Sequence, residues 1–251
     1  MLKDRVAIVT GASSGIGRAI ALAYGRAGAR VAVSDLDAQG AAGEETVAAV
    51  RAAGGDAAFI AADVSRPDDC ASLVQHAVER WGRLDIACNN AGIGGDLAPT
   101  ADYPIESWDR VIRVNLSGVF YGMKAQIGQM LKNGGGAIVN IASILGAVGL
   151  ANAPAYTAAK HGVVGLTQAA ALEYGAQGVR VNAVGPGFIH TPMISGMESD
   201  AASLQQLVAL HPIGRLGKPE EVAELVLWLS SPAASFATGA YYPIDGGYLA
   251  R

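Results

Sequence analysis

Short apolar runs rich in Val, Ile and Ala alternate along the chain with longer Ala-rich segments, and this alternation restricts the fold more than any other feature. The apolar runs contain few alternating polar residues, as is typical of parallel strands that are covered by helices on both faces. The longer segments have the length and composition of helices. The pattern therefore predicts an α/β fold built from βαβ units.

We expect a Rossmann fold: a doubly wound, seven-stranded parallel sheet with helices on both faces. No linker, repeat or low-complexity tract interrupts the rhythm, which favours a single domain over residues 1–251, with Gly187–Pro212 as a candidate substrate lid. The predicted strands are Val6–Thr10, Arg30–Asp35, Ala57–Ala61, Leu84–Cys88, Ala137–Ile141, Val179–Val184 and Tyr241–Ile244. The predicted helices are Gly15–Ala27, Gln39–Ala53, Arg66–Trp81, Ile105–Lys132, Ala155–Tyr174 and Lys218–Leu229.

Charge and cysteine content argue against several classes of partner. The net charge is -4, and Lys and Arg are scattered, so neither nucleic acid nor an anionic membrane surface is an expected partner. Cys70 and Cys88 lack a CxxC spacing and the four His are dispersed, so no metal site or disulfide framework is expected. The first residues do not resemble a signal peptide, and a reducing cytoplasm fits this composition.

A glycine-rich turn, TGASSGIG at residues 10–17, connects the first predicted strand to the first predicted helix. Its glycines allow a tight turn, close approach of the backbone to a pyrophosphate, and close packing of the helix on the strand. The helix N-terminus adds free N–H groups and a partial positive charge. We expect this turn to bind a dinucleotide through Gly11, Ser13, Ser14, Gly15, Ile16 and Gly17.

Asp35 ends the second predicted strand, eighteen residues beyond Gly17, where a Rossmann fold holds an acidic residue against the adenosine ribose. A carboxylate there accepts hydrogen bonds from the ribose hydroxyls and repels a 2'-phosphate. Leu36 follows, where an NADP-binding protein would more plausibly offer a cation. The sequence thus predicts NAD as the cofactor, although an ordinary solvated strand end is the alternative interpretation of Asp35.

At this point the chain resembles the short-chain dehydrogenase/reductase family, in the branch whose members have about this length, over essentially all of its residues. The landmarks occur in order: TGASSGIG at 10–17, Asp63-Val64, NNAG at 89–92, Asn115, Ser143, Tyr156 with Lys160, and PG at 186–187. The resemblance implies that Asp63 and Val64 meet the adenine ring. It also implies further cofactor-binding residues: Asn89, Ala91, Gly92, Pro186, Gly187, Ile189 and Thr191.

Tyr156 and Lys160 in the segment AYTAAKHG are four residues apart, which places both side chains on one face of a helix. A Tyr packing on a Lys stem is the simpler interpretation. The family resemblance instead implies hydride transfer between a nicotinamide and a carbinol carbon, with Tyr156 as the general acid/base. A phenol has a reference pKa near 10, so we expect the Lys160 ammonium and the oxidised nicotinamide to lower it. Both residues would also contact the cofactor, Lys160 through the nicotinamide ribose.

Ser143 and Asn115 complete the expected catalytic set. Ser143 follows the fifth predicted strand, and its hydroxyl can hydrogen-bond the substrate oxygen as charge develops there. Asn115 lies inside a long predicted helix, where its side chain can compete for backbone hydrogen bonds and distort the helix. The resemblance implies that Asn115 holds a water that connects Lys160 to solvent; a polar residue at a helix break is the alternative.

The expected substrate is a small-molecule alcohol or ketone, and its neighbourhood in the sequence is apolar. The residues concerned are Ile93, Leu97, Ile144, Leu145, Val148, Leu150, Met193 and Met197. A hydrophobic secondary alcohol or ketone therefore fits better than a highly charged compound. The resemblance also implies a homotetramer. Two alternatives stay open: an NADPH-dependent 3-oxoacyl-thioester reductase and a non-catalytic NAD-binding sensor.

Overall fold

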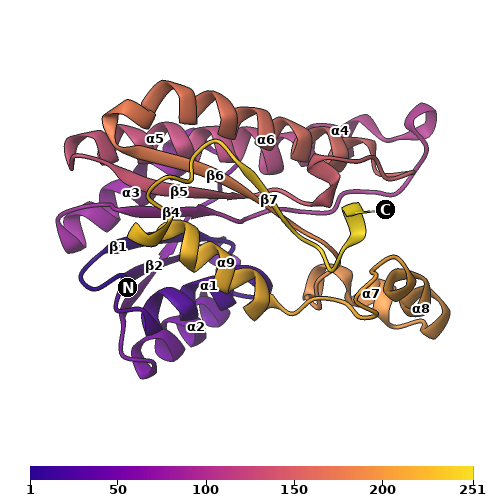
Figure 1. The fold of residues 1–251 in the computed structure, drawn as a ribbon, viewed down its shortest axis with the longest axis horizontal. Coiled ribbons are helices and arrows are strands. Elements are labelled where there is room, and N and C mark those ends of the chain that lie inside the picture. The colour runs from indigo at the N-terminus through magenta and orange to yellow at the C-terminus, as the bar shows by residue number, and fades with distance from the viewer. Residues whose placement is uncertain (251) are drawn as a thin grey trace.

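Parallel strands fill the centre of the protein (Figure 1). The computed structural model describes residues 1–250, with the exception of the Met197 side chain, and Arg251 lies outside the described residues. Within this range seven strands form one sheet in the order β3-β2-β1-β4-β5-β6-β7. The strands are β1 (Val6–Thr10), β2 (Arg30–Asp35), β3 (Asp56–Ala61), β4 (Ile86–Asn89), β5 (Gly136–Ile141), β6 (Val179–Pro186) and β7 (Tyr241–Ile244). The predicted fold class is confirmed.

The order of the strands reverses between β1 and β4. After β1 the chain builds β2 and β3 on one side, and it then crosses to build β4 to β7 on the other side. In open sheets of this kind, ligands bind at the carboxyl ends of the strands beside such a reversal. The topology therefore directs attention to the residues that follow β1 and β4.

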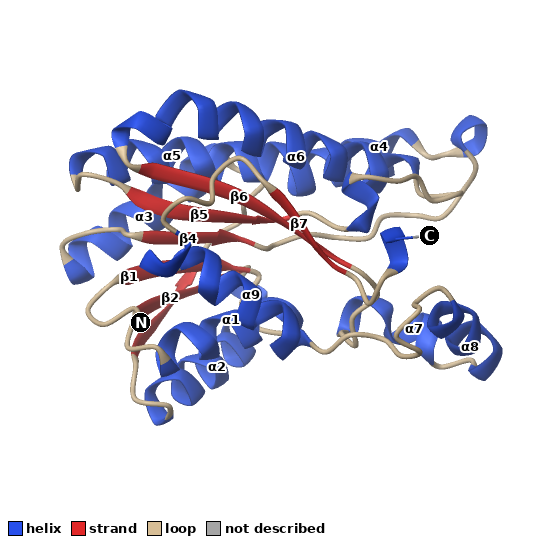
Figure 2. Cartoon of the chain, viewed as in Figure 1, coloured by secondary structure: helices blue, strands red, loops and turns tan. Residues whose placement is uncertain are grey.

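Helices cover both faces of the sheet (Figure 2). One face carries α1 (Gly15–Arg26), α2 (Gly40–Ala52) and α9 (Pro219–Ser230), and the other carries α3 (Pro67–Trp81), α5 (Gly118–Lys132) and α6 (Pro154–Tyr174). The central strand β1 is apolar from Val6 to Val9 because both of its faces are covered. Ala7 and Val9 pack in the core on one side of the sheet, and Val6 and Ile8 pack in the core on the other side. Each side chain of a doubly covered strand must be apolar, whichever face it points to.

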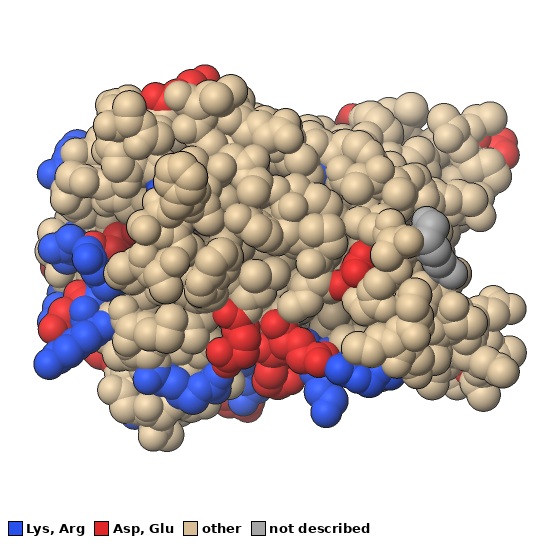
Figure 3. All heavy atoms as spheres, viewed as in Figure 1, with Lys and Arg blue, Asp and Glu red and all other residues tan. Residues whose placement is uncertain are grey.

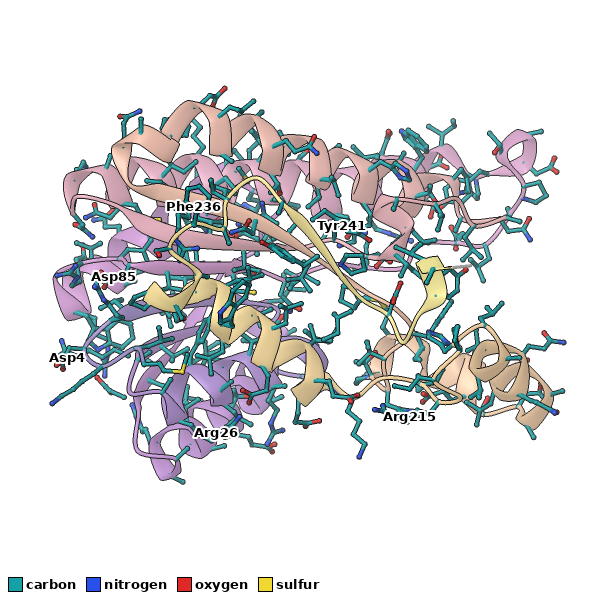
Figure 4. The ribbon with its side chains drawn as sticks, viewed as in Figure 1. Asp4, Arg26, Asp85, Arg215, Phe236 and Tyr241 are labelled. Atoms are coloured by element: carbon teal, nitrogen blue, oxygen red, sulfur yellow. The ribbon has the colours of Figure 1, made fainter. Side chains whose placement is uncertain are left out.

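The predicted bounds agree with the structure to within two residues except over residues 105–132, and two of the differences have a clear physical cause. The single helix predicted over residues 105–132 is α4 (Ile105–Ile112) and α5, joined by a π-helical turn over Arg113–Ser117 that contains Asn115. The expected local distortion is thus present. The fourth strand begins at Ile86 rather than at Leu84, because the Asp85 carboxylate accepts hydrogen bonds from the Val6 N–H at 2.9 Å and from Arg5 and Arg83. Asp85 is labelled in Figure 4, at the start of the strand.

The chain between β6 and α9 forms a separate group of short helices (Figure 1). It contains a 3-10 turn at Pro192–Ile194, α7 (Ser195–Glu198) and α8 (Ala201–Ala209). The two ends of this segment are tied together, because the His190 N–H donates to the Gly217 carbonyl at 3.0 Å and His211 Nε2 accepts from the Phe188 N–H at 3.2 Å. The segment is therefore an ordered excursion from the carboxyl edge of the sheet.

Most of the surface in Figure 3 is uncharged, and Lys and Arg side chains are interspersed with Asp and Glu along its left and lower borders. Among the residues described, no helix has the length and apolar character needed to cross a membrane.

Candidate active site

The glycine-rich turn after β1 has the backbone that a bound phosphate group requires. Gly11 has φ +64° and Gly15 has φ +52°, a region that residues with side chains rarely adopt. A Cβ at Gly11 would lie 2.9 Å from the Ala91 Cα, and a Cβ at Gly17 would overlap the Gly11 carbonyl oxygen. Gly17 therefore serves the close packing of helix on strand, as expected from the sequence.

A cavity of about 470 Å³ opens above this turn. Ten of the expected cofactor-binding residues line it: Gly11, Ser14, Gly15, Ile16, Asp35, Asp63, Val64, Ala91, Gly92 and Thr191. The structure thus gathers, in one place, residues that end or follow five different strands. We refer to this space as the nucleotide cavity.

The polar groups of the nucleotide cavity fit an adenosine ribose. Asp35 Oδ2 accepts a hydrogen bond from the Ser13 N–H at 3.1 Å, and Asp35 Oδ1 accepts one from the Leu36 N–H at 2.9 Å. These bonds fix the carboxylate at the wall of the cavity while leaving lone pairs for further donors. Ser34 Oγ also faces this cavity, is buried, and has no hydrogen-bond partner among the described residues. Buried polar atoms are usually paired, so the cavity suits a ligand that carries hydroxyl groups.

A second cavity, of about 410 Å³, adjoins the nucleotide cavity. The two share Ile16, Asn90, Gly92, Thr191 and Met193. Expected catalytic and nicotinamide-site residues line the second cavity: Ser143, Tyr156, Lys160, Pro186, Gly187 and Ile189. The rest of its wall is largely apolar and includes Leu97, Ile144, Leu145, Leu150, Phe188 and Ile194. We refer to this space as the substrate cavity.

Tyr156 and Lys160 lie on the first turns of α6, with the Lys160 Nζ 5.4 Å from the centre of the Tyr156 ring. Lys160 is 3% exposed and donates a hydrogen bond to the Ile141 carbonyl at 2.8 Å. Burial lowers the pKa of Lys160 to about 8. Burial also raises the pKa of Tyr156 to about 12, and a hydrogen bond with Ser143 offsets part of this effect.

The expected lowering of the Tyr156 pKa by Lys160 and the oxidised nicotinamide together is not seen in the protein chain alone. There, desolvation raises the pKa of the phenol, and the Lys160 ammonium donates its hydrogen bond to a backbone carbonyl. At neutral pH Tyr156 carries its proton. The site consequently presents a phenol donor rather than a ready base.

Asn115 is fully buried and lines neither cavity with its side chain. Its Oδ1 accepts from the Ile93 N–H at 2.8 Å, and its Nδ2 donates to the Ile93 carbonyl at 2.8 Å. A Cβ built at Gly92 would lie 3.2 Å from Asn115 Oδ1 and 3.8 Å from Lys160 Nζ. The π-helical turn thus brings Asn115 to the vicinity of Lys160.

Three expected cofactor-binding residues line neither cavity: Ser13, Gly17 and Asn89. Asn89 is 4% exposed, and its amide is bonded to Gln126 and Asn140 in a buried network behind the sheet edge. Ser13 is also buried, and its hydroxyl donates to the Gln39 carbonyl at 3.4 Å. Its backbone N–H reaches only Asp35.

Asn90 was not singled out from the sequence, although it is the neighbour of Asn89 in the NNAG motif. It lines both cavities, and its Nδ2 donates to the carbonyls of Thr10 and Gly11 at 2.9 and 3.2 Å. The signal that could have found it is the second Asn of the motif, since residues alternate in direction at the end of a strand. Thr10 contributes as well, because its Oγ1 accepts the N–H groups of Asn90 and Ala91.

No group of three or more metal-ligating side chains that could hold an ion occurs in the described part of the chain. Beside the nucleotide cavity the protein presents a phenol, an ammonium group and a hydroxyl, from Tyr156, Lys160 and Ser143.

Comparison with known proteins agrees with this geometry. A family model described as "Enoyl-(Acyl carrier protein) reductase" matches residues 11–249. The cyclohexanol dehydrogenase of Acinetobacter sp. (strain SE19) is 48% identical over 99% of this chain and 96% of its own length. The cis-4-hydroxycyclohexanecarboxylate dehydrogenase of Sinomonas cyclohexanicum is 46% identical over 98% of this chain and 97% of its own length.

Solved structures show the same relationship. The crystal structure of levodione reductase superposes with a TM-score of 0.96 at 38% identity, covering 100% of this chain and 99% of that one. A putative 2-deoxy-D-gluconate 3-dehydrogenase from Agrobacterium tumefaciens, with bound NADP, superposes with a TM-score of 0.90 at 37% identity, covering 100% and 98%. With its strand order, its glycine-rich turn and these relatives, the chain belongs to the short-chain dehydrogenase/reductase family.

Proposed function

We propose that this oxidoreductase uses NAD to interconvert a hydrophobic secondary alcohol and its ketone, with Tyr156 as the general acid/base. One observation carries the proposal: Ser143, Tyr156 and Lys160 line a single, mostly apolar cavity that adjoins the nucleotide cavity. A substrate in this space would lie beside the phenol of Tyr156, next to the cavity that would hold the cofactor. Bound there, the cofactor supplies the hydride acceptor for oxidation and the hydride donor for reduction.

Tyr156 moves the proton in either direction. In ketone reduction its hydroxyl gives a proton to the carbonyl oxygen, and in alcohol oxidation the phenolate takes the hydroxyl proton. Because the pKa of Tyr156 is raised to about 12 by burial, the phenol is the dominant form at neutral pH. The proton therefore stands ready for reduction, whereas oxidation should become faster as the pH rises.

Ser143 and Lys160 organise the proton transfer. The Ser143 hydroxyl hydrogen-bonds the substrate oxygen and also interacts with Tyr156, where it opposes part of the pKa increase. The Lys160 ammonium lies 5.4 Å from the centre of the phenol ring, and we assign it to the ribose of the nicotinamide half of the cofactor. Asn115 and Lys160 both lie close to Gly92, and we assign Asn115 to the proton path between Lys160 and solvent.

NAD is the proposed cofactor because of Asp35. Its carboxylate is held at the wall of the nucleotide cavity by two backbone N–H groups, and a 2'-phosphate placed there would be repelled. Leu36 beside it offers no cation. One solved relative has NADP bound, so the choice rests on the charge of this position in this chain. The negative charge of Asp35 is also the reason why we rank an NADPH-dependent 3-oxoacyl-thioester reductase second.

A ring alcohol is the proposed substrate class. The apolar lining of the substrate cavity favours a hydrocarbon framework, and the two relatives reported above are named for cyclohexanol and for a hydroxycyclohexanecarboxylate. We assign the 187–212 segment to the lid, since Met193 and Ile194 in it line the cavity. We further propose a homotetramer in the cytoplasm.

A panel of alcohols tests the proposal. Cyclohexanol, a sugar alcohol and a 3-hydroxyacyl thioester are each offered to the purified enzyme with NAD or NADP, and formation of the reduced cofactor is followed by absorbance. We expect the highest kcat/KM for cyclohexanol with NAD. Turnover of only the thioester with NADP would establish the rival reductase. NAD binding without turnover of any alcohol or ketone would favour the non-catalytic sensor.

A further inference from the structure

Tyr241, the first residue of the edge strand β7, reaches across the sheet to the catalytic serine. Its hydroxyl donates a hydrogen bond to the Ser143 carbonyl oxygen at 2.7 Å. The two residues are 98 positions apart in the sequence, and β6 lies between their strands. Figure 4 labels Tyr241 beside β7, on the face of the sheet that α6 covers. This contact joins the outer edge of the sheet to the active site.

Glycine at position 185 makes the contact sterically feasible. A Cβ at Gly185, in β6, would overlap the hydroxyl and ring of Tyr241. The Tyr241 ring therefore lies directly over the backbone of β6, where a side chain would otherwise stand. Because Gly185 in β6 has no side chain, Tyr241 in β7 can extend over β6 and reach the Ser143 carbonyl.

The Ser143 backbone is held by two independent donors. Its carbonyl accepts from the Gly146 N–H at 2.8 Å as well as from Tyr241, and its Oγ accepts from the Leu145 N–H at 3.2 Å. The bonds to Leu145 and Gly146 lie within the short turn that follows β5 and can move with it. The Ala142 N–H, just before Ser143, donates to the Val184 carbonyl of β6 at 2.8 Å, and Tyr241 adds a bond from β7 to the Ser143 carbonyl itself.

We propose that Tyr241 is a positioning residue, which holds Ser143 in place for proton transfer by way of the Ser143 carbonyl. This inference rests on the function proposed above, since it gives Ser143 a task at the substrate oxygen. Tyr241 itself does not line the substrate cavity. Burial, assisted by the nearby Asp245, raises the pKa of Tyr241 to about 12, so its hydroxyl remains a donor throughout the working pH range.

The substitution Tyr241→Phe removes the hydroxyl and keeps the ring. Tyr242→Phe is the matched control, because Tyr242 is the next residue of β7 and packs against Trp228 on the opposite face of the sheet. We expect Tyr241→Phe to lower kcat about tenfold with little change in KM, as positioning effects do. NADH affinity should be unchanged in both variants.

A readout that does not depend on activity is hydrogen exchange at the amides of Leu145 and Gly146, both of which donate to Ser143. We expect exchange at these amides to be about tenfold faster in Tyr241→Phe and unchanged in Tyr242→Phe. Gly185→Ala, which displaces the Tyr241 ring, should produce the same acceleration. This measurement stays informative even if no alcohol is turned over, and such a failure would count against the proposed function alone.

A double-mutant cycle with Ser143→Ala decides whether Tyr241 acts through Ser143. The proposal predicts that Tyr241→Phe lowers kcat in the wild-type background and has almost no further effect on Ser143→Ala. An equal loss of kcat in both backgrounds overturns it. Unchanged exchange at Leu145 and Gly146 in Tyr241→Phe also overturns it, whatever the effect on rate.

Discussion

The Lys160 ammonium lies 5.4 Å from the centre of the Tyr156 ring and donates a hydrogen bond to the carbonyl of Ile141, the last residue of β5. Burial changes the pKa of both groups, in opposite directions. The pKa of Lys160 falls to about 8, and that of Tyr156 rises to about 12. Each shift favours the neutral form of its group. The pair is thus a buried phenol beside an ammonium that is only marginally stable as a cation.

The cost of the buried Lys160 charge can be measured as stability. Between pH 8 and 10.5 the unfolded chain binds more protons at this residue than the folded chain, so the free energy of unfolding rises with pH across that window. The full span corresponds to about 3 kcal/mol. At pH 7 the penalty is present in full, so Lys160→Met should raise the free energy of unfolding there by about 2 kcal/mol after the lost hydrogen bond is counted.

Urea unfolding at pH 7 and pH 9 checks this prediction. The free energy of unfolding of the wild type relative to that of Lys160→Met should be higher at pH 9 than at pH 7. Lys124→Met, at an exposed position of α5, is the control and should leave the free energy of unfolding unchanged at both pH values. A Lys160→Met variant that is less stable than the wild type at pH 7 would show that the ammonium stabilises the fold.

Asp35 should control the choice of cofactor through its charge. Asp35→Asn keeps the shape of the side chain and one hydrogen-bond acceptor but removes the repulsion of a 2'-phosphate. We expect the ratio of kcat/KM for NAD to that for NADP to fall about tenfold, corresponding to the loss of about 1.4 kcal/mol of discrimination. Initial rates with both cofactors give the ratio. Asp37→Asn, at an exposed position two residues further on, is the control and should leave the ratio unchanged.

Asn115 should matter for stability as well as for turnover. Asn115→Leu leaves the N–H and the carbonyl of Ile93 without their partners, which costs about 2 to 4 kcal/mol if both stay buried. Asn115→Asp keeps the acceptor for the N–H and should lose less. Denaturant unfolding followed by circular dichroism measures the free energy of unfolding, which should decrease from wild type to Asn115→Asp to Asn115→Leu. Equal stability of wild type and Asn115→Leu would mean that water replaces both bonds.

Exposed apolar side chains on α5 and α6 fit the proposed homotetramer. Phe120 is 47% exposed and Leu172 is 87% exposed, and Phe236, labelled in Figure 4, is fully exposed near β7. We expect sedimentation at the mass of four chains of 25.5 kDa. Phe120→Asp combined with Leu172→Asp should reduce that mass, whereas Ile213→Asp, which replaces an exposed residue after α8, should not. Wild-type sedimentation as a monomer at micromolar concentration would contradict the assembly.

Much of the fold was predictable because its rules are local. The apolar runs gave the positions of all seven strands to within about two residues, and the glycines of residues 10–17 marked the turn at β1. The distortion at Asn115 followed from the chemistry of an amide within a helix. These features depend on short stretches of sequence and on the period of side-chain directions.

The remainder depends on contacts between distant residues. Asn89 was assigned to the cofactor, but Gln126 and Asn140 take up its amide, and neither partner could be identified from the motif alone. The pKa of Tyr156 was expected to fall because the sequence contains Lys160, whereas its burial depends on the packing of the whole cavity. The contact of Tyr241 with Ser143 depends on the register of β6 and β7.

The central claim is that Tyr156 transfers the proton while the cofactor is held by other residues. The most direct measurement compares wild type and Tyr156→Phe in NAD-linked oxidation of cyclohexanol, with NADH affinity determined by fluorescence on the same samples. We expect kcat to fall by about a thousandfold and NADH affinity to change by less than about threefold. A Tyr156→Phe enzyme that oxidises cyclohexanol at a rate close to that of the wild type would contradict the account.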